Sequence, residues 1–289
     1  MSYEGMIIRP PSEAYSILLQ ATVGCSHNKC SFCGTYKDKR FRIKDDQTIF
    51  GDLAWAAKYC RQQDRLFIMD GDALIIPQPR LVAILAEIRD KLPWVKRVGT
   101  YANSKGIKMK TDEELVQLRE LGLKIIYLGV ESGDDVVLQK INKGATAQKL
   151  IDMGRRVKAA GIKLSVTVLL GIGGRERSME HARNTGRLLT AMDPDYVGAL
   201  MLMILDDTSL GQEYRAGRFT PLEPLELLKE LREMFVHTDL SGGLFFANHA
   251  SNYLPIKARL PRDKAKTIKR IDEALSGQVA LRPEWMRAL

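Results

Sequence analysis

Short apolar runs alternate with longer amphipathic stretches along most of the chain. Apolar residues recur at helical spacing in the longer stretches, near 47–63, 79–92, 111–121, 134–159 and 178–192. The short runs have the length and apolar character of buried strands, and they lie at 16–23, 66–69, 95–101, 125–130, 164–170 and 196–205. This alternation predicts parallel strands joined by right-handed helical crossovers.

Local signals at the ends of these stretches support the prediction. Thr111 precedes three acidic residues, which is typical of a helix N-cap followed by an acidic first turn. Gly122 and Gly161 each stand between a predicted helix and the next strand, where a C-cap glycine is expected. Six βα units fall short of the eight in a closed barrel of about 250 residues. We therefore predict an α/β fold that forms a partial (β/α)6 TIM-like barrel.

The last part of the chain, 206–289, follows a different pattern. It contains a predicted helix at 223–236, a strand at 243–247 and a basic helix at 262–275. No repeat, low-complexity tract or flexible linker separates it from the preceding units. The sequence thus predicts a barrel core over 1–205 and a C-terminal α/β extension over 206–289 that packs on the barrel.

Composition is that of a large globular protein. Of the 289 residues, 45% are hydrophobic and 27% are charged, which permits a substantial core. No run of about 18 apolar residues is present, and residues 1–11 lack the order of a signal peptide. We expect a cytoplasmic protein that does not associate with membranes.

The formal net charge of +9 permits nucleic-acid binding. Lys and Arg are nevertheless spread along amphipathic helices, and no long basic tail is present; examples are Arg155, Arg156, Lys158 and Lys163. A solvated surface with some basic groups for an anionic ligand is therefore the favoured interpretation, and nucleic-acid binding is the alternative.

Three of the four cysteines lie within nine residues, directly after the first predicted strand. Cys25, Cys30 and Cys33 have the spacing Cys-x4-Cys-x2-Cys, and in a reducing compartment such a group favours metal binding over disulfides. The loop would lie at the carboxyl end of a barrel strand, where βα loops build active sites. The fourth, Cys60, ends an apolar helical stripe and is predicted to be a buried, inert thiol.

Two kinds of metal centre are compatible with three thiolates in one loop. A four-iron cluster usually takes four cysteines, so three would leave one iron open to an outside molecule, which is a catalytic arrangement. A zinc site with His27 as the fourth ligand is the alternative, although a Cys-x-His pair strains a single tetrahedral site. The motif favours the iron–sulfur cluster and leaves zinc open.

With these motifs the sequence resembles the radical S-adenosylmethionine (SAM) superfamily, most of all the branch with oxygen-independent coproporphyrinogen oxidase and the Elongator catalytic subunit. Its members hold a [4Fe–4S] cluster with three cysteines, and the methionyl amine and carboxylate of SAM chelate the open iron. Their common spacing, Cys-x3-Cys-x2-Cys, is one residue shorter than the spacing here. The resemblance implies that Cys25, Cys30 and Cys33 are the cluster ligands and that Phe32 lies near the adenine.

The ends of later strands carry further matches. Met69-Asp70-Gly71-Asp72-Ala73 parallels a Gly-Gly-Glu-like turn whose carbonyls bind the methionyl amine, which implies contacts by Gly71 and Asp72. An ordinary turn is the alternative for Asp72. Thr100-Tyr101-Ala102-Asn103 resembles a Glu-Ala-Asn-Pro segment, in which Tyr101 replaces a carboxylate that would bind the ribose.

The remaining cofactor contacts that the resemblance implies lie at the fourth and fifth strands and in the segment between them. Glu131, in Leu128-Gly129-Val130-Glu131-Ser132-Gly133, would accept from the ribose hydroxyls. Lys143 would pair with the methionyl carboxylate, with a surface lysine as the alternative. Thr167 and Leu169 would touch the ribose and adenine, and core packing is an equal alternative for Leu169. In the extension, His249 and Asn252 are candidate substrate contacts, or else members of a structural network.

The resemblance implies reductive cleavage of SAM to methionine and a 5′-deoxyadenosyl radical, which then abstracts hydrogen from a substrate. It also implies an electron donor of the flavodoxin or ferredoxin type. No cysteine follows Cys60, so we expect no auxiliary cluster. A small-molecule substrate is favoured. The alternatives are a macromolecular substrate such as tRNA, and a non-catalytic zinc or iron–sulfur binding protein.

Overall fold

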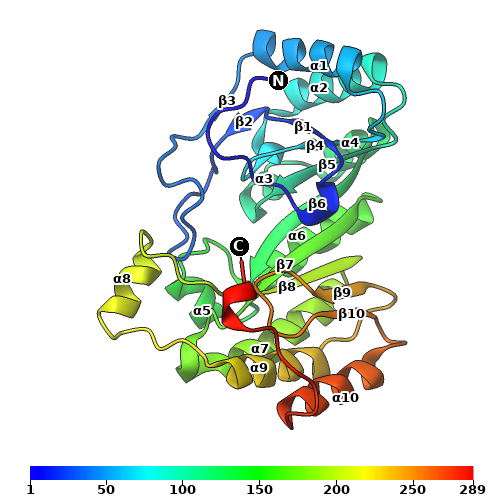
Figure 1. The fold of residues 1–289 in the computed structure, drawn as a ribbon. Helices are drawn as coiled ribbons and strands as arrows, with labels where there is room; N and C mark the ends of the chain where they lie inside the picture. The colour runs from blue at the N-terminus through cyan, green and yellow to red at the C-terminus, as the bar shows by residue number, and fades with distance from the viewer. Residues whose placement is uncertain (289) are drawn as a thin grey trace. The chain divides into compact units, whose positions relative to one another are not determined.

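The computed structural model describes residues 1–288 and has an α/β fold (Figure 1). Within these residues, eight strands form a mostly parallel sheet in the order β1-β4-β5-β6-β7-β8-β9-β10, and β2 and β3 form a separate pair. Two compact units divide the chain. The first comprises Met1–Asn28, Thr35–Leu128 and Arg156–Leu164, and the second Lys29–Gly34, Gly129–Arg155 and Ser165–Leu289. The α/β fold predicted from the sequence is confirmed.

Parallel strands form the centre of the first unit. β1 (Ile17–Leu19), β4 (Arg65–Ile68), β5 (Arg97–Ala102) and the first part of β6 (Leu123–Glu131) pair in that order. Most of their residues are buried, which explains the continuous apolar runs in the sequence. The predicted strand at 16–23 is two strands, because the chain leaves β1 and pairs again as β2 (Thr22–Val23) with β3 (Arg42–Ile43).

The helices of the first unit begin where their capping residues predict. α1 (Asp46–Tyr59) is capped by Asp45, and α4 (Asp112–Glu120) by a complete capping box of Thr111 and Glu114. α2 (Gln78–Lys91) lies beside α1 (Figure 1). A short helix, α3 (Ser104–Lys108), follows β5. Because α1 ends earlier than predicted, Cys60 is its C-cap and is half-buried rather than buried.

The second unit continues with β7 (Lys163–Leu170), β8 (Tyr196–Met201) and β9 (Leu244–Ala247) in parallel, and with β10 (Ile256–Arg259) antiparallel to β9. Alternate side chains of β7 are fully buried. Thr167 and Leu169 lie on the opposite face of the strand, where Thr167 is half-buried. Because β9 pairs with β8, the predicted extension contributes strands to this sheet; the boundary at residue 205 stays a prediction.

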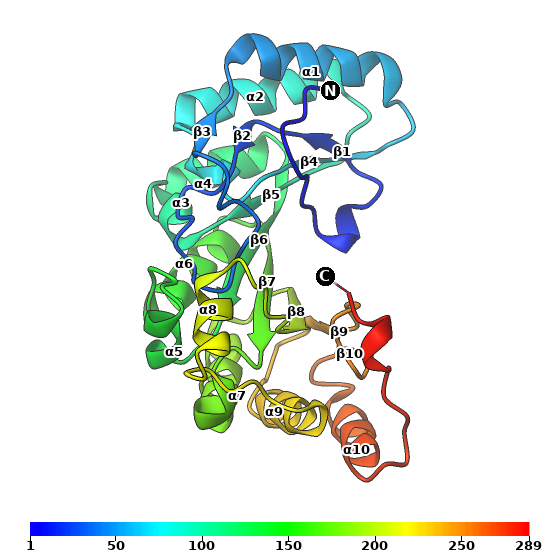
Figure 2. The same ribbon diagram turned by 60° about the vertical axis from the view of Figure 1, so that its left-hand side comes forward.

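Helices of the second unit include α7 (Gly174–Met192), α9 (Pro224–Val236) and α10 (Lys264–Leu275), of which α7 packs on α9 and α9 on α10 (Figure 2). α8 (Ser209–Arg215) is a short helix that the sequence did not predict. No helix in residues 1–288 is both long and apolar enough to cross a bilayer.

The single helix predicted at 134–159 is two helices, α5 (Asp135–Lys140) and α6 (Ala147–Ala159), and the second of them runs from the second unit into the first. Asn142 and Gly144, between them, have left-handed backbones with φ of 55° and 73°. Asparagine and glycine tolerate this conformation best, so the chain turns here at little cost.

Candidate functional site

The turn after β4 approaches the first cysteine of the motif, within the first unit. Gly71 donates its backbone N–H to Gly24 O at 3.1 Å. A Cβ built on Gly71 would lie 2.6 Å from Cys25 Cβ and 3.1 Å from Cys25 Sγ. Any residue with a Cβ would overlap Cys25 here, so the close approach of the turn to Cys25 requires glycine at position 71.

Asp70 fastens the same turn to the start of the cysteine loop. Its carboxylate Oδ2 accepts from Gly24 N and from Gln20 Nε2, each at 3.0 Å. The side chain is fully buried, and this burial raises the pKa of the carboxyl. The turn is thus held to the loop by a backbone and a side-chain contact.

Asp72 is directed into the protein and organises the residue after Cys25. It is fully buried, and accepts from Ser26 Oγ at 2.6 Å and from Asn103 N at 3.3 Å. Asn103 Nδ2 in turn donates to Ser26 Oγ at 2.8 Å. Burial raises the pKa of Asp72 to about 6. Of the two residues predicted to contact the cofactor in this turn, Gly71 lies against Cys25, whereas the Asp72 side chain contacts Ser26 and Asn103.

Tyr101, which replaces the carboxylate of the resembling motif, belongs to an aromatic stack. Its ring meets Phe67 edge-on with centroids 5.0 Å apart, and Tyr127 at 6.0 Å. Burial, and the neighbouring Tyr127, raise the pKa of Tyr101. The phenol is therefore neutral and cannot take over the role of a carboxylate.

The second half of the cysteine loop is anchored inside the second unit. Ser31 N donates to Ile141 O at 2.9 Å, and Ser31 O accepts from Leu210 N at 2.8 Å. Phe32, next in sequence, packs against a buried apolar cluster that contains Leu169 and Phe219. Two predicted adenine contacts, Phe32 and Leu169, thus share one apolar cluster, while half-buried Thr167 lies on the same strand face as Leu169.

Cys25 belongs to the first unit, and Cys30 and Cys33 belong to the second. Within either unit, over residues 1–288, no three His, Cys, Asp or Glu side chains gather closely enough to hold a metal ion. Three thiolates are nevertheless the donor type that an iron–sulfur cluster takes, and all three thiols are half-buried. His27, the zinc alternative, is half-buried in the first unit.

The two predicted polar cofactor contacts of the second unit form an ion pair. Lys143 Nζ donates to Glu131 Oε1 at 2.9 Å, and each side chain is 12% exposed. A Cβ on Gly129 would lie 2.5 Å from that oxygen and 3.1 Å from Nζ. The pair therefore needs a glycine at position 129.

Glu131 occupies a strained turn at the end of β6. Its φ is 65°, and Ser132 N donates across it to Val130 O at 2.8 Å. This is a three-residue γ-turn of the rarer hand, which costs on the order of 1–3 kcal/mol for a residue with a side chain. Such strain persists only where the surroundings fix it.

The next residues are fixed to helix α7 of the same unit. Ser132 Oγ lies 2.8 Å from His181 Nδ1, and Gly133 N donates to Thr185 Oγ1 at 2.8 Å. Asp134 binds Arg177 Nη2 at 2.8 Å. Burial alone would raise the pKa of Asp134, but this guanidinium and the hydrogen bonds from Val137 N and Asn184 outweigh it, and the pKa is lowered. Three successive residues after Glu131 are thus tied to one helix.

His249 and Asn252 are held by contacts within the second unit, to the strand β8 and to residues of the extension. Asn252 is fully buried and donates from Nδ2 to Ala199 O at 3.0 Å. His249 Nδ1 lies 3.0 Å from Ser251 Oγ, and burial together with Arg282 lowers the pKa of the imidazole. These contacts favour the structural network over a substrate contact.

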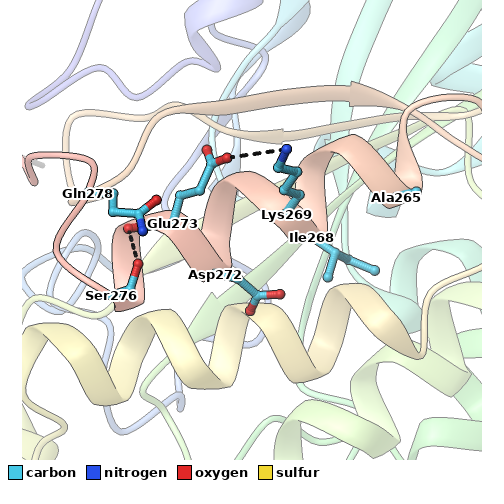
Figure 3. Close-up of a pocket in the computed structure, with 7 residues that line it drawn as sticks. All are labelled: Ala265, Ile268, Lys269, Asp272, Glu273, Ser276 and Gln278. Carbon is cyan, nitrogen blue, oxygen red and sulfur yellow. Dashed lines mark hydrogen bonds and ion pairs between the residues drawn. The ribbon is translucent and has the colours of Figure 1, made fainter.

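A hollow on the surface of α10 lies apart from these residues in the sequence (Figure 3). Its charged groups are paired, Lys269 with Glu273 at 3.9 Å and Asp272 with Arg232 at 2.5 Å. No strand end contributes to its lining, so it offers none of the chemistry found at the ends of β4 and β6.

Several residues of the site were not singled out in the sequence, among them Ser26, Ser132 and His181. The signal for His181 is present but weak: Ser178, His181 and Thr185 recur at helical spacing on the buried face of α7, among apolar residues. Polar residues at such positions need partners inside the protein. The sequence does not reveal which ones.

A sequence model of the radical SAM superfamily matches residues 19–189, more than half of the chain. The chain therefore belongs to the radical SAM superfamily and is a radical SAM enzyme. Its cofactors are those typical of the family, a [4Fe–4S] cluster and SAM.

Among curated proteins, the chain is 23% identical to 4′-phospho-dehydrooxetanocin synthase of Priestia megaterium over 203 residues, which is 62% of this chain and 27% of that one. It is also 23% identical to tRNA-2-methylthio-N(6)-dimethylallyladenosine synthase of Dehalococcoides mccartyi over 200 residues, 67% of this chain and 47% of that one. The chain thus spans about a quarter to a half of the length of these relatives.

Solved structures resemble the chain in fold. Coproporphyrinogen III oxidase of Escherichia coli has a TM-score of 0.56 at 13% identity, over 76% of this chain and 51% of that one. Methylornithine synthase has a TM-score of 0.54 at 17% identity, over 78% and 63%. This likeness supports the predicted partial TIM-like barrel, and because it extends to several branches it does not fix the branch.

Replacing Gly129 by alanine is expected to separate Glu131 from Lys143, because the new methyl group would overlap the carboxylate. If Glu131 and Lys143 bind SAM as the sequence predicts, the SAM affinity of the reconstituted protein should fall about tenfold, as for the loss of one good charged contact. Equilibrium binding of SAM to the anaerobic protein measures the change. Gly242→Ala, where a Cβ meets nothing within 4 Å, is the matched control and should bind normally. Equal affinities in the two variants would contradict the prediction.

Proposed function

We propose that Cys25, Cys30 and Cys33 hold the [4Fe–4S] cluster, and that the chain cleaves SAM reductively to start hydrogen abstraction from a small-molecule substrate. The observation that carries the proposal is the approach of Gly71 to Cys25, because the turn expected to bind the methionyl amine lies beside the first cluster ligand. When bound, the cluster and SAM supply one-electron cleavage of a carbon–sulfur bond, which yields methionine and a 5′-deoxyadenosyl radical.

The polar residues of the second unit have the chemistry that binding SAM requires. The Glu131 carboxylate has two oxygens, which can accept from both ribose hydroxyls. Lys143 supplies a cation for the methionyl carboxylate, and its contact with Glu131 keeps the two groups within 2.9 Å. Because both side chains are mostly buried, their interaction with a ligand is stronger than it would be in water.

The apolar residues would flank the adenine and exclude water from the reacting bond. Phe32 and Leu169 belong to one cluster, and Thr167 lies half-buried on the same strand face as Leu169. In the first unit, the Asp72 carboxylate holds Ser26, so we propose that Asp72 contacts SAM through its backbone and not through its side chain. The Glu131-Ser132-Gly133 motif also leads us to propose the coproporphyrinogen oxidase and Elongator branch.

The family implies a reductant, and we propose a donor of the flavodoxin or ferredoxin type. A tRNA substrate is the second candidate, supported by the net charge of +9 and by the tRNA in the name of the Dehalococcoides relative. The small molecule is preferred because the basic residues are dispersed over the helices. If tRNA is the substrate, adding bulk tRNA should raise the rate of 5′-deoxyadenosine formation.

Anaerobic reconstitution with iron and sulfide tests the proposed function. We expect about four irons per chain, and release of 5′-deoxyadenosine when SAM and dithionite are added. Cys30→Ala should lose both, whereas Cys60→Ala should retain both, because Cys60 lies outside the motif at the end of α1. One zinc per chain and no cleavage of SAM would refute the proposal.

A further inference from the structure

The strained turn at Glu131 needs a structural cause. Its φ of 65° is unfavourable for a residue with a side chain, so the residues that follow must hold it. Ser132 is the first of them, and its hydroxyl also accepts from Asp134 N at 3.0 Å. The contact that directs this hydroxyl into the protein is the one with His181.

His181 is fully buried on α7, where its ring is held through Nδ1. Nδ1 lies 2.8 Å from Ser132 Oγ and 3.4 Å from Thr185 Oγ1, while Nε2 lies 3.7 Å from Glu230 Oε1. Burial lowers the pKa of this imidazole to about 4, so the ring is neutral at physiological pH. A neutral ring can hold the hydroxyl without a buried charge.

Glu230, on α9, lies near the imidazole and holds the end of the strand β7. It is fully buried and accepts from Gly171 N at 2.5 Å and from Ser178 Oγ at 2.6 Å. Gly171 follows directly on β7, the strand that carries Thr167 and Leu169. His181 therefore lies between the residue after Glu131 and the carboxylate that holds the end of β7.

We propose that His181 is a positioning residue for Glu131: its Nδ1 holds the Ser132 hydroxyl and thereby fixes the turn that directs the Glu131 carboxylate. The proposal rests on the proposed function, in which Glu131 binds the ribose of SAM. His181 touches neither cofactor nor substrate in this role. Its effect is on affinity for the ribose-bearing part of SAM.

Two substitutions separate positioning from simple core packing. In His181→Asn the side-chain amide occupies the place of Nδ1 and keeps the contact with Ser132, whereas in His181→Gln the amide lies toward Glu230 and loses it. Packing alone predicts that Gln, which is closer to histidine in volume, is the better replacement. Positioning predicts the opposite order.

The experiment compares equilibrium binding of SAM and of methionine to the anaerobically reconstituted protein, without added reductant. Methionine carries the amine and carboxylate but has no ribose. The ratio of the two affinities therefore reports the ribose contact. We expect Ser132→Ala and His181→Gln to weaken SAM binding about tenfold, with methionine binding unchanged. His181→Asn should stay within about twofold of the parent.

Two controls make the result decisive. Glu131→Gln tests the premise, and it should change the SAM-to-methionine ratio at least as much as Ser132→Ala. His237→Asn, at the end of α9 with its Nδ1 on Glu233 O, should leave the ratio unchanged. A normal ratio in Glu131→Gln would overturn the ribose role itself. A changed ratio in Glu131→Gln, with normal ratios in Ser132→Ala and His181→Gln, would overturn only the positioning role. A folding defect would lower both affinities together and leave the ratio unchanged, which also counts against positioning.

Discussion

A chain with Gly71→Ala is expected to lose most of its iron on reconstitution while keeping its fold. The added Cβ would stand 2.6 Å from Cys25 Cβ, well inside contact distance, and the close neighbours are the backbone and short side chain of one residue. Relief requires Cys25 to move by a few tenths of an ångström or more. Mutating a residue that holds a metal ligand in place typically lowers metal affinity 10- to 100-fold. Iron and sulfide per chain measure the loss.

The control for this prediction is Gly51→Ala, in the first unit on α1. A Cβ there meets nothing within 4 Å, and alanine favours a helix over glycine by about 1 kcal/mol. This variant should be slightly more stable and should bind iron normally. If Gly71→Ala also retained full iron, the approach of the turn to Cys25 would have no role in cluster binding.

Glu230→Gln is expected to stabilise the protein at pH 8 and not at pH 5. Burial raises the pKa of Glu230 from 4.5 to about 7, so the folded protein keeps this proton over a range in which the unfolded chain has released it. The folded state then binds more protons, and stability falls as pH rises from 4.5 through 7. At about 1.4 kcal/mol per pKa unit, the loss is on the order of 3 kcal/mol.

Glutamine avoids this loss because it resembles the protonated acid. Its carbonyl can accept from Gly171 N–H and its amide can donate to the Ser178 hydroxyl. Urea unfolding at pH 5, 6, 7 and 8 measures the difference between the variant and the parent. Glu226→Gln, on the same helix, should behave oppositely: backbone N–H and Arg175 lower the pKa of Glu226, so its removal destabilises at pH 7 and has no effect well below pH 4. A pH-independent difference for Glu230→Gln would contradict the raised pKa.

The sequence predicted the fold well because each element depends on local pattern. Apolar runs gave the strands, and Thr111 with Glu114 marked a helix start that the structure confirms. The prediction of one helix over 134–159 was wrong. Helices can tolerate asparagine and glycine, so Asn142 and Gly144 did not mark a break in the amphipathic pattern. Only the backbone shows that both adopt left-handed conformations and end the helix.

The site was less predictable, since its side chains find partners far away in sequence. An aspartate in a polar turn is expected to be exposed, yet Asp72 is buried by partners at Ser26 and Asn103, 46 and 31 residues away. Motifs identified Glu131 and Lys143 separately. Their contact depends on the shortness of α5, which the sequence pattern did not reveal.

The pairing of strands follows their order of synthesis. In the first unit β4 pairs with β1, β5 with β4 and β6 with β5; in the second, β8 pairs with β7, β9 with β8 and β10 with β9. Each of these strands therefore leaves the ribosome after the strand it pairs with has been made. Each half of the sheet can therefore grow in one direction during translation, one strand at a time.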